Sequence, residues 1–74
     1  MTTLSKTEKI QIIESRSKSV DYRKFSLGID LLVENAKSAP DSEAVLVIES
    51  AIEECSAQLS VLNSELAIVN ALTE

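Results

Sequence analysis

The sequence lacks histidine and tryptophan and contains one residue each of glycine, proline, cysteine, methionine, tyrosine and phenylalanine. Without histidine there is no imidazole base for a Ser-His or Cys-His nucleophile pair. A lone Cys55 excludes an internal disulfide framework and, without histidine, an ordinary zinc site. The single glycine excludes a Gly-rich phosphate loop. We therefore expect a protein that is not an enzyme and that holds no cofactor and no metal.

Long hydrophobic runs are also missing. The longest uninterrupted apolar run is AVLVI at 44–48, and the first nine residues, MTTLSKTEK, lack an apolar stretch of signal-peptide length. We expect a cytoplasmic protein with no membrane partner.

Aliphatic residues are abundant: 45% of the 74 residues are apolar, although only Tyr22 and Phe25 are aromatic. A chain of this size buries little surface by itself and usually gains stability from disulfides, a metal or association. With the first two excluded, the composition favours association with further copies.

The charge is unevenly distributed. Residues 1–26 hold six of the seven cations against three acids, whereas residues 27–74 hold one cation against nine acids. Such asymmetry indicates either two binding surfaces or two halves that face each other.

The only proline divides the chain almost in half within KSAPDSEA. The pattern predicts one domain, 1–74, with a helical segment over about 5–38, a turn over about 38–41 and a helix over about 41–73. Ser5 and Glu8 match a capping box for the first helix, and Asp41 or Ser38 suits the N-cap of the second.

The second half has a regular apolar seam, in which spacings of three and four residues alternate over more than three heptads. The seam consists of Val45, Ile48, Ile52, Cys55, Leu59, Leu62, Leu66 and Val69. A second apolar line adjoins it: Ala44, Val47, Ala51, Val61, Ile68 and Leu72, interrupted by Glu54, Gln58 and Glu65. One seam suits a partner helix, whereas two adjoining lines require two neighbours. The sequence thus predicts an all-α, long antiparallel helical hairpin that assembles into a helical bundle as a homodimer or a larger oligomer.

The first half has two apolar lines that point in different directions. One line is Ile10, Ile13, Ser17 and Val20, and the other is Tyr22, Phe25, Ile29, Leu32, Ala36 and Ala39, which predicts a seam over 22–39. Two alternatives follow: a first helix broken near 19–21 or bent at Gly28, or a continuous helix that contacts different neighbours along its length.

Three glutamates cluster on the second helix: Glu49, Glu53 and Glu54. Carboxylates one turn apart bind metal in some bundles, but the Glu-x-x-His element is missing, which favours a solvated face. We interpret this acidic face as the surface that binds a protein partner. Cys55 occupies a seam position, which indicates a small buried core residue rather than a reactive thiol.

The stretch ESRSKSVDYRKFS, at 14–26, is cationic and rich in serine. Lys9, Arg16, Lys18 and Arg23 could hold phosphates, with the Tyr22 hydroxyl as a further donor. The alternative is that some cations pair internally, because an antiparallel hairpin sets Arg23 and Lys24 near Glu53 and Glu54.

The layout of two helices, a short turn, an acidic chain and cations on the first helix resembles the family of the plasmid RNA-binding protein Rop. That resemblance implies two hairpins paired into a four-helix bundle and RNA binding by the first helix; it covers layout and no binding motif. The layout is also similar to helical-hairpin proteins with which phages sequester signalling nucleotides.

These observations support two functional hypotheses. The first is a non-enzymatic, homo-oligomeric helical protein of the inhibitor or adaptor type, of the kind that phages and mobile elements encode, which binds another protein such as a nucleic-acid enzyme. The second is an RNA-binding or nucleotide-binding hairpin. A third, structural reading is a subunit of a small assembly.

Overall fold

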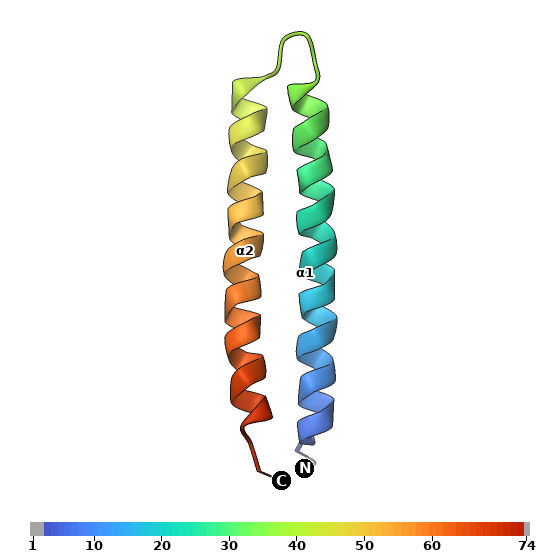
Figure 1. The fold of residues 1–74 in the computed structure, drawn as a ribbon, viewed down its shortest axis with the longest axis vertical. Coiled ribbons are helices and arrows are strands. Elements are labelled where there is room, and N and C mark those ends of the chain that lie inside the picture. The colour runs from blue at the N-terminus through green and yellow to red at the C-terminus, as the bar shows by residue number, and fades with distance from the viewer. Residues whose placement is uncertain (1–2, 74) are drawn as a thin grey trace.

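The computed structural model describes residues 3–73 and shows two antiparallel helices joined by a short loop (Figure 1). Helix α1 runs over Lys6–Asn35 and helix α2 over Ser42–Asn70, and the described residues contain no strand. The hairpin measures 57 by 19 by 14 Å. The expected all-α helical hairpin is therefore confirmed.

A capping box begins α1, as the sequence predicts. The Ser5 hydroxyl oxygen accepts a hydrogen bond from the backbone N–H of Glu8 at 3.1 Å, and the Ser5 backbone N–H donates to Glu8 Oε1 at 3.2 Å. Two of the N–H groups that a helix start leaves without intrahelical partners are satisfied in this way.

Helix α1 is continuous over its 30 residues, through 19–21 and through Gly28 (Figure 1). The alternative of a broken or bent first helix is therefore wrong. A single stripe explains why no break is needed, because one set of positions keeps alternating spacings of three and four from end to end. The residues of this stripe, all buried or half-buried against α2, are Lys6, Ile10, Ile13, Ser17, Val20, Lys24, Leu27, Leu31 and Glu34.

The predicted seam over 22–39 does not face α2. All six of its members are exposed, among them Tyr22 at 80%, Phe25 at 73%, Leu32 at 67% and Ile29 at 44%. The first apolar line instead continues through Lys24, Leu27, Leu31 and Glu34, and the charged residues at two of these positions conceal the continuation from a hydrophobicity pattern.

Helix α2 turns its regular seam toward α1. Cys55 is 1% exposed and Val69 7%, and the other six members of that seam are half-buried. Among the described residues these two are the only buried apolar side chains, so the core is one narrow stripe.

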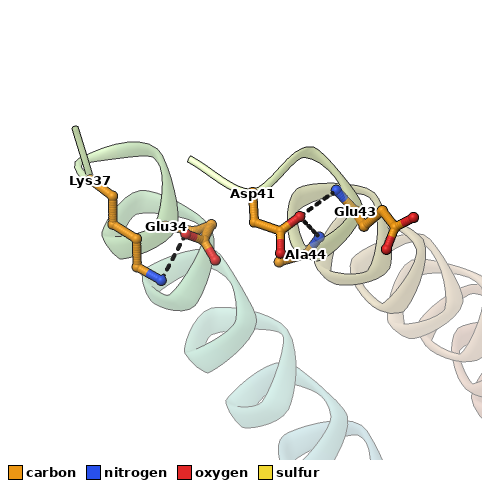
Figure 2. A network of polar contacts seen from close by, with 5 residues as sticks. All are labelled: Glu34, Lys37, Asp41, Glu43 and Ala44. Atoms are coloured by element: carbon orange, nitrogen blue, oxygen red, sulfur yellow. Dashed lines mark hydrogen bonds and ion pairs between the residues drawn. The ribbon is translucent and has the colours of Figure 1, made fainter. Parts of the chain in front are cut away.

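The loop between the helices is held by local polar contacts (Figure 2). Asp41, rather than Ser38, is the N-cap of α2: its Oδ1 accepts from the backbone N–H groups of Glu43 at 2.9 Å and Ala44 at 3.4 Å. On the other side of the loop, Lys37 Nζ lies 2.9 Å from Oε2 of the buried Glu34. Helix α1 ends at Asn35, three residues before the predicted end at 38, and Pro40 restricts the residue before it to extended backbone.

The far end of the hairpin is closed by a side chain from the opposite helix. Lys6 Nζ donates hydrogen bonds to the carbonyl oxygens of Asn70 at 2.9 Å and Leu72 at 3.0 Å. Helix α2 has no basic residue in its own last turn, so Lys6 supplies the positive charge that a helix C-terminus favours. The helix ends at Asn70, before the predicted end at about 73.

Neither helix has an apolar stretch long enough to cross a membrane, among the residues described.

Gly28 offers a test of the α1 geometry. A Cβ built on Gly28 meets no atom within 4 Å, and the backbone is helical there. Gly28→Ala therefore gains helix propensity without a clash, and we expect the free energy of unfolding to rise by roughly 0.5–1 kcal/mol. Urea unfolding followed by circular dichroism measures the change.

The matched control is Ala57→Gly, at an exposed mid-helix position of α2, which should lower the free energy of unfolding by a similar amount. A loss of stability in Gly28→Ala would contradict a straight, uncrowded α1 at this point.

Candidate interaction surfaces

The outer surface of the hairpin is rich in large apolar side chains. Twelve of them are at least 40% exposed among the described residues. They are Leu4, Ile12, Tyr22, Phe25, Ile29, Leu32, Val33, Leu46, Val47, Val61, Ile68 and Leu72. A monomeric soluble protein rarely exposes large contiguous apolar patches, and those that do occur often mark interaction sites.

Four of these side chains form one patch on α1. Tyr22, Phe25, Ile29 and Leu32, called here the aromatic patch, recur at spacings of three and four residues and so share one face of the helix. A shallow groove runs beside them, where Phe25, Ile29 and Leu32 meet Gly28 on α1 and Ile52 on α2. The patch contains both aromatic residues of the chain, and neither is used in the hairpin core.

A second apolar surface lies along α2. The α2 line consists of Ala44, Val47, Ala51, Val61, Ile68 and Leu72. Val47, Val61 and Ile68 are 68%, 63% and 57% exposed. Unlike the aromatic patch, this line extends over nearly the whole helix.

The structure brings three of the four predicted phosphate-binding cations together. Lys9, Arg16 and Arg23 recur every seven residues of a continuous helix, so they lie on one flank of α1 and are called here the cationic strip. Lys18 lies about 200° around the helix from Arg16, and Tyr22 belongs to the aromatic patch. The predicted five-residue phosphate site is thus divided between different faces.

The cationic strip borders the α2 line. A shallow groove between the helices is lined by Ser15, Arg16, Ser19 and Val20 of α1 and by Ala57, Gln58, Val61 and Leu62 of α2. Long cationic side chains commonly border apolar surface in this way, with the aliphatic stem on the apolar side and the charge in water.

The three glutamates of the predicted acidic face are also divided. Glu49 and Glu53 lie one turn apart, on the flank of α2 that carries Ser56 and Ser60. Those two serines line a groove with Lys24, which also borders the groove beside the aromatic patch. Glu54 lies about 100° further around the helix, next to Val47 and Ala51 of the α2 line.

The internal ion pairs considered for Arg23 and Lys24 do not form. Within residues 3–73 the ion pair of the structure is Lys37–Glu34 (Figure 2), and neither Arg23 nor Lys24 meets a carboxylate. Arg23 is exposed and Lys24 is half-buried in the α1 stripe. The cations of the 14–26 stretch are therefore not neutralised by α2.

Groups that could carry covalent or metal chemistry are few. The thiol of Cys55 is free and its residue is 1% exposed, in the middle of the seam. Among the described residues no three cysteine or carboxylate side chains come together as a metal site.

Comparison with known proteins gives no family. No protein-family model, no curated protein sequence and no solved structure matches this chain.

Proposed function

We propose that this chain is a non-enzymatic protein-binding module whose aromatic patch docks into an apolar groove with a basic rim on another protein. The observation that carries the proposal is the exposure of Tyr22 and Phe25 on a rigid helix, beside Ile29 and Leu32. Exposed aromatic side chains are costly in a monomer, and tyrosine is among the residue types that dominate binding energy at protein interfaces.

The charge around the patch supports a basic partner. Residues 21–57, the half of the hairpin nearer the loop, hold eight acids against three cations. Asp21 lines the same groove as Phe25, and Glu49 and Glu53 lie along the same side of the hairpin. Complementary charge at the rim of an interface speeds association and selects among partners.

Photo-crosslinking followed by titration tests this function. A photo-reactive benzophenone amino acid in place of Phe25, in cells that make the protein, should crosslink to one basic protein that mass spectrometry can identify. With that partner purified, Phe25→Ser should weaken binding about tenfold or more, because truncating an anchor side chain costs about 2 kcal/mol or more. Glu49→Lys with Glu53→Lys should weaken it further.

The matched control is Gln11→Ala, an exposed position of α1 far from the patch, which should leave the affinity unchanged. Crosslinking only to copies of the same chain, or equal affinity of the Phe25→Ser variant for the purified partner, would contradict the proposal.

A second candidate function, RNA or nucleotide binding, is supported by the alignment of the cationic strip. Successive cations lie about 10.5 Å apart along the helix axis, and none of the three is neutralised by α2. Charges in such a row can contact phosphates along a nucleic-acid backbone.

Fluorescence anisotropy with a labelled RNA hairpin tests this candidate. If the strip binds phosphates, affinity should fall steeply with salt, and Arg16→Ala should weaken binding and reduce the salt slope by about 1. Lys18→Ala is the matched control, since Lys18 lies on another face. Absent binding, or binding unaffected by salt, would end this candidate.

A further inference from the structure

The hairpin exposes more surface than a compact protein of its mass. Its accessible surface is 5683 Å², whereas the scaling for folded monomers gives about 4,450 Å² at 8.0 kDa. The excess, about 1,200 Å², exceeds the roughly 800 Å² that each partner contributes to a standard protein interface. One copy of a second protein could therefore cover what the two-helix fold leaves open.

The α2 line has the shape that a neighbouring helix requires. From Ala44 to Ile68, its last member within α2, the line spans about 36 Å at the rise of an α-helix, more than half of the 57 Å length of the hairpin. Together with Glu54, Gln58 and Glu65, which interrupt the line, its members keep alternating spacings of three and four residues, the pattern by which one helix packs along another. The small residues Ala44 and Ala51 permit close approach, and both are half-buried at the edge of the seam.

The same side of the molecule carries charges of both signs that are not paired within the hairpin. The cationic strip lies on α1, while Glu54 and Glu65 interrupt the α2 line. None of these five residues forms an ion pair in the described structure. A twofold contact brings two identical surfaces together. It is therefore favoured when one surface carries both positive and negative charges, which can pair with the opposite charges of the second copy.

We propose that a second copy of this chain covers the α2 line and the adjoining cationic strip, forming a four-helix bundle. The contact is isologous: glutamates of each α2 line lie near cations of the partner's strip, and Val47, Val61 and Ile68 supply its apolar core. The aromatic patch lies on the other side of the hairpin and stays exposed in the dimer, available to a different protein. This inference goes beyond the proposed function, because the two surfaces share no residue.

Sedimentation equilibrium over a range of protein concentrations tests the inference. The wild-type chain should associate to dimers, and Val61→Glu with Ile68→Glu should weaken the association about 100-fold or more, because each substitution replaces an apolar side chain of the dimer core with a charged one. Both side chains are exposed in the single hairpin, so the helices should persist by circular dichroism.

Phe25→Ser is the matched control, since it removes a similarly exposed apolar side chain from the opposite surface and should leave the dimer unchanged.

A charge exchange supplies the second variant: Arg16→Glu with Arg23→Glu should weaken association, and adding Glu54→Arg and Glu65→Arg should restore it. A wild-type chain that is monomeric throughout, a Val61→Glu/Ile68→Glu variant that associates normally, or a charge exchange that restores nothing would overturn the inference.

Discussion

The contact between α1 and α2 is the only packing contact between elements in the described chain, and it occupies one stripe of each helix. A helix has the circumference to face two or more neighbours, so a two-helix protein with apolar residues on additional faces leaves part of its surface uncovered. Among the described residues Cys55 and Val69 are the only apolar side chains that this contact buries, and large aliphatic side chains remain exposed elsewhere. The proposed docking of the aromatic patch and the proposed dimer both follow from this uncovered apolar surface.

The two stripes that meet differ in character. The α2 seam is apolar throughout, whereas the α1 stripe includes Ser17, Lys24 and Glu34 and has Lys6 at its end. The polar members act mainly at the ends: Lys6 binds the last carbonyl groups of α2, and Glu34 pairs with Lys37 beside the loop. The Lys6 contact joins the two helices, so it favours one alignment of α1 and α2 over a slipped one, whereas the Glu34–Lys37 pair is local to the end of α1. Large apolar residues of α1, such as Phe25, Ile29 and Leu32, meanwhile lie outside the contact.

The sequence alone predicts α2 better than α1, for a physical reason. In α2 the apolar period and the packing stripe coincide, so spacing identifies the face that meets α1, and the Ser5 and Asp41 caps follow from local hydrogen-bonding rules. In α1 the strongest apolar line over 22–39 is the exposed aromatic patch, while the true stripe passes through Lys24 and Glu34. A rule that places apolar residues in the core therefore selects the wrong face of α1, because the apolar side chains of the aromatic patch are exposed. The signal for the correct face is the series of positions from Lys6 to Glu34, in which spacings of three and four residues alternate without a break.

The candidate surfaces could be predicted only in part from the sequence. Charged residues can be assigned to a shared face of a helix only once that helix is known to be continuous. Continuity aligns Lys9, Arg16 and Arg23 and separates Lys18 from them, and it divides Glu49 and Glu53 from Glu54. The α2 line with the cationic strip and the aromatic patch are therefore two separate surfaces of the hairpin.

The central claim is that the single hairpin is an incomplete fold whose stability depends on a second molecule. The most direct test is urea unfolding of the purified chain at protein concentrations that differ about 100-fold. If folding and self-association are coupled, the midpoint of unfolding rises with concentration. A midpoint independent of concentration would show that two helices suffice, and would contradict the account.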